Sequence, residues 1–150
     1  MTALIGFTAG STGEPKPNAK TVASLRQSTS HNALALRQAL GDLSAVPNIV
    51  ATVPPQHMYG IELSVFLPLL AGFPVHSGRP LFPADIARAL SEVPRPRLLV
   101  STHAHFRALL ESGVTWPELD LIVSATAPLD PTLAAAVETL ARAPLLELFG

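Results

Sequence analysis

Short segments built around consecutive apolar residues constrain the fold of this chain more than any other feature. They occur at 48–53 (NIVATV), 97–102 (RLLVST), 119–126 (LDLIVSAT) and 145–150 (LLELFG). A strand with apolar side chains at successive positions is buried on both faces, as in a parallel sheet. Amphipathic stretches separate these runs, and the alternation predicts an α/β fold, a mostly parallel sheet with helices on both faces.

The helical spacing of apolar residues, and the prolines and glycines that end helices and strands, predict the remaining elements. We expect helices at 20–41, 59–72, 83–93, 103–113 and 130–143, and two further short strands at 3–7 and 73–77. The first helix has an apolar stripe at Ala33, Leu36, Leu40 and Leu43. Pro68 is expected to kink the second helix, and Asp130 to cap the last one.

Composition bounds the class of protein. The 150 residues are enough for one domain, spanning 1–150, and only 14% of them are charged, against about 25% in an average soluble domain. We therefore expect apolar surfaces that a partner or another part of the same protein covers, and self-association of the chain through them. An unusually apolar small domain is the alternative.

Several function classes are excluded or disfavoured. The net charge is −1 with no basic cluster, which disfavours nucleic-acid binding. No cysteine is present, which excludes disulfides and thiolate chemistry. The best apolar stretch, about 14 residues, is shorter than the roughly 20 needed to span a membrane. The start MTALIGFTAG lacks the basic region of a signal peptide, so the cytoplasm is the expected compartment.

The segment TAGSTGEPK (8–16) has the composition of a phosphate-binding loop. Glycine lets backbone N–H groups approach a phosphate closely, hydroxyls add hydrogen bonds and lysine adds charge. We expect a strand before this loop and a helix after it. The spacing fits neither the Walker pattern nor the dinucleotide-binding pattern, and a flexible surface turn of small residues is the alternative. The candidate ligands are Thr8, Gly10, Ser11, Thr12, Gly13 and Lys16.

FTAGSTGEPK resembles the phosphate-loop motif of the adenylate-forming (AMP-binding) enzymes, which include acyl-CoA synthetases, nonribosomal-peptide adenylation domains and luciferases. Ala9 and Pro17 depart from the usual serine and glycine. VPPQHMYGIE (53–62) looks like the family's Pro-x-x-His-x-x-Gly segment, and LIVSATAPLD (121–130) like its Ser-Gly-Ala/Gly-Ala-Pro-Leu turn. LLELFG looks like the strand that enters the family's Thr-Glu motif, whose Thr and Mg²⁺-binding Glu would follow Gly150.

The resemblance implies roles for particular residues. The loop residues would hold the β- and γ-phosphates of ATP, with Lys16 as a catalytic residue. His57 would be the second catalytic residue, beside the acyl pocket, although on the residues alone a histidine packed in a proline-rich turn is the simpler interpretation. Thr126, Ala127 and Pro128 would flank adenine and the acyl group. Mg²⁺ would arrive with ATP, and no metal ligand is expected in the chain itself.

The resemblance further implies an ATP-dependent carboxylate ligase. Such an enzyme forms an acyl-adenylate and transfers the acyl group to a thiol of coenzyme A or of the phosphopantetheine on an acyl carrier protein. The run FLPLLAGFPV favours a fatty or aryl acid, although such runs more often form plain core. We expect the chain to be a fragment of an enzyme about three times as long, and inactive alone. The alternatives are a non-catalytic nucleotide- or protein-binding fragment and, less favoured, a kinase-like phosphotransferase.

The remaining histidines carry weaker expectations. His103 and His105 would point about 200° apart on a helix, which makes a poor metal site, and we expect solvated residues at a helix start. His31 lies on a polar helical stretch and receives no role.

Overall fold

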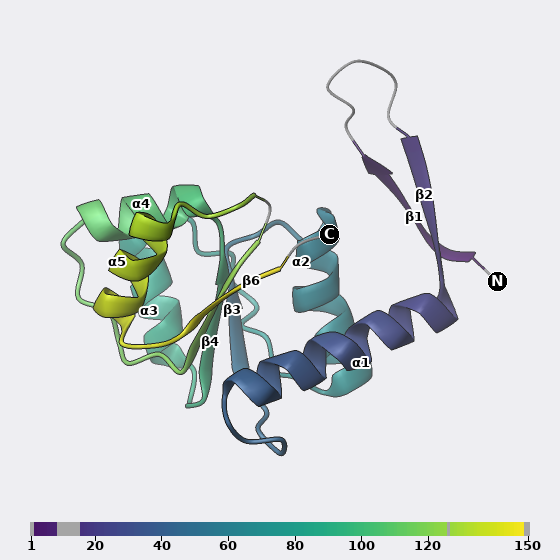
Figure 1. The fold of residues 1–150 in the computed structure, drawn as a ribbon, viewed down its shortest axis with the longest axis horizontal. Coiled ribbons are helices and arrows are strands. Elements are labelled where there is room, and N and C mark those ends of the chain that lie inside the picture. The colour runs from purple at the N-terminus through teal and green to yellow at the C-terminus, as the bar shows by residue number, and fades with distance from the viewer. Residues whose placement is uncertain (1, 9–15, 126, 149–150) are drawn as a thin grey trace.

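The computed structural model describes residues 2–8, 16–125 and 127–148. Figure 1 shows the arrangement of the elements. Their bounds are β1 (Thr2–Thr8), β2 (Lys16–Thr21), α1 (Val22–Ala39), β3 (Asn48–Ala51), α2 (Met58–Ile61), the wide-turn helix η1 (Glu62–Ala71), α3 (Pro83–Glu92), β4 (Arg97–Ser101), α4 (His103–Glu111), β5 (Leu121–Ser124), α5 (Pro131–Ala141) and β6 (Leu145–Glu147).

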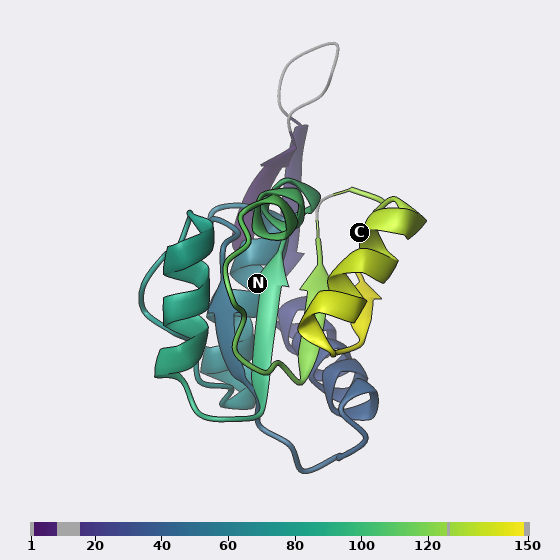
Figure 2. The same ribbon diagram turned by 90° about the vertical axis from the view of Figure 1, so that its left-hand side faces the viewer.

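The central sheet has four parallel strands in the order β3-β4-β5-β6, so each new strand joins the edge next to its predecessor. The register aligns Val50 with Leu99, Leu99 with Ile122, and Ile122 with Leu145. In Figure 2 strands β4 and β5 are seen side by side and point the same way, with helices on either side of the sheet. The predicted parallel sheet is confirmed, with shorter strands than the apolar runs suggested.

Two apolar cores lie on the two faces of this sheet. On one face, Val50, Leu99 and Ile122 pack with buried side chains of α3, α4 and α5. On the other face, Ala51, Val100 and Val123 pack with buried side chains of α1 and η1. Burial of one large apolar side chain contributes about 2 kcal/mol of transfer free energy. The successive apolar residues of each strand therefore supply both cores alternately, as predicted.

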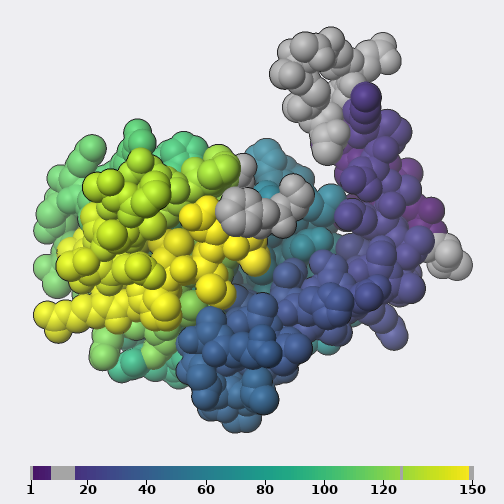
Figure 3. Space-filling model, in the orientation of Figure 1, coloured from purple at the N-terminus to yellow at the C-terminus, as the bar shows by residue number. Residues whose placement is uncertain are grey.

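The N-terminal region differs from the prediction. β1 pairs with a second strand, β2, in an antiparallel hairpin, so the glycine-rich segment connects two strands rather than a strand and a helix. In Figure 3 the purple hairpin lies at one end of the molecule, beside the start of α1. α1 begins only at Val22, where Thr21 Oγ1 accepts a hydrogen bond from Ser24 N–H at 3.1 Å and Ser24 Oγ accepts one from Thr21 N–H at 3.0 Å. This reciprocal cap fixes the end of β2 and the start of α1.

Three smaller expectations also needed correction. Leu43 does not extend the apolar stripe of α1, because the helix ends at Ala39 and the Leu43 side chain is 65% exposed. The stretch 59–72 forms α2 followed by η1, which contains Pro68 within its wide turns and ends at Gly72 with φ +73°. The strand expected at 73–77 is reduced to one bridge between Val75 and Ile49.

That bridge lies on the outer edge of β3. Ile49 N–H donates to the Pro74 carbonyl and His76 N–H donates to the Ile49 carbonyl, both at 2.8 Å. The chain thus passes from η1 on one face, around the edge of β3, to α3 on the other face.

Candidate functional site

The hairpin holds the candidate phosphate loop at its tip. Thr8 and Lys16 are directly opposite each other in the β1–β2 register, and Lys16 is exposed. Residues that face each other in an antiparallel pair lie on the same side of the ribbon. The pairing therefore brings together the two residues that border segment 9–15. Gly10, Ser11, Thr12 and Gly13 lie outside the described residues.

His57 lies next to this hairpin. It is the residue immediately before α2, and its side chain is exposed. It borders a hollow of about 310 Å³, which we call the His57 hollow, lined by Leu4, Ile5, Gly6, Phe7, Asn18, Gln56, His57, Met58 and Ile61. The structure thus brings His57 beside the two strands that carry the candidate loop.

Gly60 permits the close packing around His57, and Gly6 lies close to a flexible side chain there. A Cβ atom on Gly60 would lie 2.0 Å from the Pro54 carbonyl oxygen, so α2 can approach the 54–55 turn only with glycine there. A Cβ atom on Gly6 would lie 3.2 Å from Met58 Cε. The Pro-x-x-His-x-x-Gly spacing therefore has a steric cause: the turn folds back onto the helix that begins after His57.

A row of polar residues crosses the carboxyl end of the whole sheet. Each strand places one apolar residue in or against the core below α3–α5: Val50, Leu99, Ile122 and Leu145. Side chains alternate along a strand, so the residue two positions later lies on the same face of the sheet. Those residues are Thr52, Ser101, Ser124 and Glu147, which we call the polar row. Thr52, Ser101 and Ser124 are at most 7% exposed. Helix-bearing α/β sheets bind ligands outside this end of the strands.

Hydrogen bonds tie one end of the polar row to α4. Thr52 Oγ1 lies 2.8 Å from Ser101 Oγ and 3.4 Å from His105 Nδ1, and Thr102 Oγ1 lies 2.9 Å from the same nitrogen. Burial lowers the pKa of His105, because a half-buried imidazolium loses hydration. His105 is therefore a packed, neutral histidine, not the solvated residue expected at a helix start, whereas His103 is exposed as expected.

Ser124 occupies the middle of the row. Its Oγ is buried and has no hydrogen-bond partner within the described part of the chain. Ser124 is the register partner of Ser101 on one side and of Glu147 on the other. At the far end, Glu147 Oε2 accepts a hydrogen bond from Leu129 N–H at 3.1 Å.

The predicted adenine-side turn follows β5 directly. Ala127 and Pro128 are exposed and Leu129 is buried, while Thr126 lies outside the described residues. The turn leads into α5, where Asp130 accepts hydrogen bonds from Thr132 N–H and Leu133 N–H. Neither Ala127 nor Pro128 borders the His57 hollow, so the structure does not unite these two parts of the predicted site.

Sequence reasoning missed the polar row and Glu147. One signal was available: each apolar run that forms a strand of the main sheet is followed or closed by a polar residue. Because the carboxyl ends of parallel strands meet at one edge, those four residues had to converge. A hollow of about 610 Å³ also exists between the ends of α4 and α5, bordered by Trp116 and Arg142, at the opposite end of the sheet.

Two negative findings apply to the described residues. No group of three or more His, Asp or Glu side chains gathers there in a way that could hold a metal ion. No helix among them is both long enough and apolar enough to cross a bilayer.

Comparison with known proteins identifies the family. The model of the AMP-binding enzyme family matches residues 1–150, and the chain belongs to this family. A 4-coumarate–CoA ligase from Halorhodospira halophila is 32% identical over 144 residues, which are 95% of this chain and 34% of that protein.

Solved structures of adenylate-forming enzymes share the fold. The O-succinylbenzoate coenzyme A synthetase of Bacillus subtilis in complex with AMP has a TM-score of 0.75 at 20% identity, over 97% of this chain and 29% of that one. A luciferase-like enzyme from the mealworm Zophobas morio has a TM-score of 0.76 at 14% identity, over 100% and 34% of the two chains. The chain therefore spans about a third of the length of the proteins it resembles.

Proposed function

We propose that this chain is the phosphate-loop part of an ATP-dependent carboxylate ligase. The observation that carries the proposal is the pairing of Thr8 with Lys16, which brings the two ends of the family's phosphate motif together and puts a cation at one of them. Membership of the AMP-binding family over residues 1–150 supports it. We further propose that residues 1–150 act as one unit, a partial AMP-binding subdomain.

The proposed reaction has two steps. A carboxylate oxygen of the acid attacks the α-phosphorus of ATP, and the bond to pyrophosphate breaks, which gives an acyl-adenylate. A thiol of coenzyme A or of a carrier-protein phosphopantetheine then attacks the acyl carbon, and AMP leaves. Charge accumulates on the departing phosphates in the first step, so hydrogen-bond donors and a cation placed there lower the barrier.

Each candidate residue has a place in this scheme. Thr8, Gly10, Ser11, Thr12, Gly13 and Lys16 bind the β- and γ-phosphates, and Mg²⁺ accompanies ATP and neutralises phosphate charge. Thr126, Ala127 and Pro128 flank adenine and the acyl group. His57 orients the carboxylate of the acid. The side chains of Ile5, Phe7 and Met58 give the His57 hollow an apolar wall, which favours a fatty or aryl acid.

Calorimetric titration of the 150-residue chain with Mg-ATP tests the loop. Lys16→Ala should weaken binding by roughly 10-fold or more, because a charge-assisted contact to phosphate is removed. Lys20→Ala is the matched control, since Lys20 lies on the same strand, four residues from the loop. Equal effects of the two substitutions would contradict a specific role for Lys16.

Turnover should be absent in the isolated chain. The relatives are about three times as long, and the proposed reaction needs groups beyond residues 1–150. Pyrophosphate release by the purified chain, abolished by Lys16→Ala, would overturn this part of the proposal.

Exposed apolar side chains on the hairpin favour a second candidate function, contact with protein. Phe7 is 68% and Ile5 53% exposed. A second copy of the chain is the partner proposed here. Light scattering should show association that Phe7→Ser reduces, and a monomer at high concentration would exclude it.

A further inference from the structure

Glu147 connects the last strand of the sheet to the turn that follows β5. It lies on β6, beside Ser124 in the register, and its side chain is half-buried. Its Oε2 accepts the hydrogen bond from Leu129 N–H at 3.1 Å. Leu129 is only 6% exposed, so without Glu147 a buried N–H group would lose its partner.

The rest of the turn is held by main-chain contacts at its beginning. Ala125 N–H donates to the Ser101 carbonyl and Leu148 N–H donates to the Ser124 carbonyl, both at 3.1 Å. At its other end, α5 is capped by Asp130 from within the helix start itself. Only the Glu147 contact crosses from the sheet to the middle of this connection, among the hydrogen bonds of the described residues. The carboxylate therefore ties the Leu129 end of this turn to β6.

We infer that Glu147 is a positioning residue for the adenosine part of the nucleotide, acting through the Leu129 backbone. The inference rests on the proposed function, which places adenine and the acyl group beside this turn. Lys16 and Glu147 then act on different parts of one ligand. Lys16 contacts the phosphates at the tip of the hairpin, whereas Glu147 fixes the backbone that faces the nucleoside.

This division predicts opposite selectivities for two variants. Glu147→Ala should weaken binding of AMP by up to about 10-fold, because binding must then order a turn that has lost its internal hydrogen bond, and leave binding of tripolyphosphate unchanged. Lys16→Ala should weaken tripolyphosphate and change AMP less. Glu147→Gln keeps an acceptor oxygen at the same place and should retain most of the AMP affinity.

The chain offers a matched control for the loss of a carboxylate. Glu138 Oε1 also accepts a backbone hydrogen bond, from Leu145 N–H at 2.8 Å. Leu145 is the first residue of β6, so this contact lies at the opposite end of the strand from Glu147. Glu138→Ala removes the same chemical contact away from the turn. A general loss of stability would affect both variants, whereas a positioning role affects AMP binding only in Glu147→Ala.

The experiment combines amide hydrogen exchange with titration of AMP and tripolyphosphate. Exchange at the Leu129 amide should be at least about 10-fold faster in Glu147→Ala than in the wild type, and close to wild type in Glu147→Gln and Glu138→Ala. Unchanged exchange at Leu129 in Glu147→Ala would overturn the inference, and so would equal losses of AMP affinity in Glu147→Ala and Glu138→Ala.

Failure of the proposed function gives a different result. A wild-type chain that binds tripolyphosphate but not AMP would refute the role of Glu147 toward adenosine and leave the loop proposal standing. A chain that binds neither ligand would refute the loop proposal and, with it, the nucleotide role of Glu147. The exchange measurement would still decide whether Glu147 holds the turn.

Discussion

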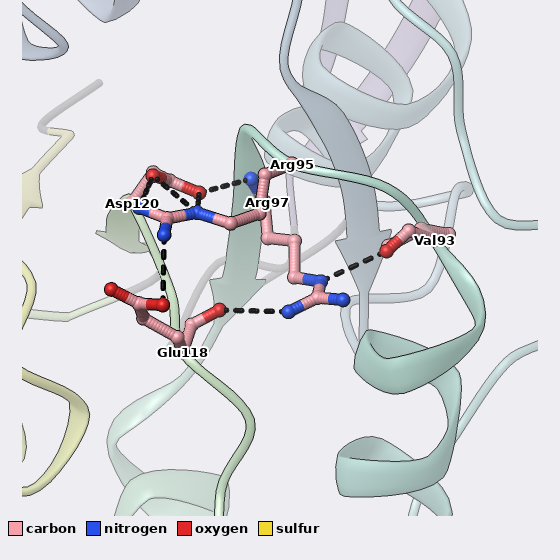
Figure 4. Close-up of polar contacts among 5 residues, drawn as sticks. All are labelled: Val93, Arg95, Arg97, Glu118 and Asp120. Carbon is pink, nitrogen blue, oxygen red and sulfur yellow. Dashed lines mark hydrogen bonds and ion pairs between the residues drawn. The ribbon is translucent and has the colours of Figure 1, made fainter.

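Arg97 and Asp120 bind each other in both directions at the amino ends of β4 and β5. Arg97 N–H donates to Asp120 Oδ2 at 2.7 Å, and Asp120 N–H donates to the Arg97 carbonyl at 3.1 Å. Arg95 adds an ion pair to the same carboxylate and a second one to Glu118 at 2.8 Å, as Figure 4 shows. The Asp120 side chain thus continues the strand pairing one step beyond the sheet.

Asp120→Ala should lower the free energy of unfolding by about 2 kcal/mol at pH 7, because hydrogen bonds to a carboxylate of low exposure are lost. Urea unfolding of the folded chain measures this value. Asp85→Ala is the control: Asp85 pairs with Arg88 on the surface of α3 and should contribute only a few tenths of a kcal/mol. A smaller effect of Asp120→Ala than of the control would contradict the two-way contact as a source of stability.

The effect of Asp120 should depend on pH. Burial opposes ionisation of Asp120, but the hydrogen bonds from Arg95 and Arg97 and their charges outweigh it, and the pKa of Asp120 is lowered. A carboxyl with a lowered pKa stabilises the fold above its unfolded pKa of about 4 and loses this contribution as pH falls through the folded pKa. The difference between wild type and Asp120→Ala should therefore shrink below pH 4. A difference that stays constant down to pH 2 would refute the role of the charge.

Gly60→Ala should destabilise the chain by at least about 2 kcal/mol, since the new Cβ would overlap the Pro54 carbonyl oxygen at 2.0 Å. The substitution should also displace the start of α2 and change the environment of His57. Thermal unfolding and the His57 imidazole signals in an NMR spectrum report these two effects. Gln27→Ala, an exposed substitution on α1, should leave both unchanged, and a Gly60→Ala protein of wild-type stability would disprove the steric account.

His105 should make stability depend on pH in a second range. Because burial lowers its pKa, the unfolded chain takes up a proton on His105 at higher pH than the folded chain does. The free energy of unfolding should thus be highest above the unfolded pKa of about 6.5 and fall as pH drops toward the folded pKa. His105→Gln should reduce this fall, whereas His103→Gln, two residues away and exposed, should not. If the free energy of unfolding depended on pH equally in the two variants, the titrating group would be one other than His105.

The sheet could be predicted from the sequence because its strands are buried on both faces. Runs such as LLV at 98–100 and LIV at 121–123 are typical of strands that are covered on both faces. The cap at Asp130 was predictable for a local reason, since a short acceptor side chain before Pro131 satisfies the first N–H groups of α5.

β2 could not be predicted, because its sequence KPNAKT contains no apolar alternation and five of its six residues are exposed. This strand exists through its main-chain pairing with β1, a non-local interaction that leaves little trace in the residue pattern. The prediction of a strand at 73–77 was wrong for the opposite reason. Its apolar residues suggest a strand, but only Val75 pairs with β3 while the chain turns around the sheet edge.

Part of the candidate site followed from local motif order, and part required the fold. His57 was predicted through the resemblance of VPPQHMYGIE to a family motif, and Gly60 lies three residues later in the same segment. The association of His57 with Gly6 and Asn18 depends on where the hairpin folds back, and the contact between Glu147 and Leu129 joins two elements 18 residues apart. Neither could be read from sequence spacing.

The segment around Val75 occupies the outer edge of β3, where another strand could otherwise pair with the sheet. Pro74 and His76 already satisfy the outward amide and carbonyl groups of Ile49, and Pro74 has no N–H to offer to another strand. β6 is the last strand at the other margin of the described sheet, where Leu145 N–H donates to Glu138 Oε1 and the chain continues past Glu147. A strand that extends this sheet, from the same polypeptide or from another one, would therefore be added at the β6 margin, next to Glu147 and the turn that it holds.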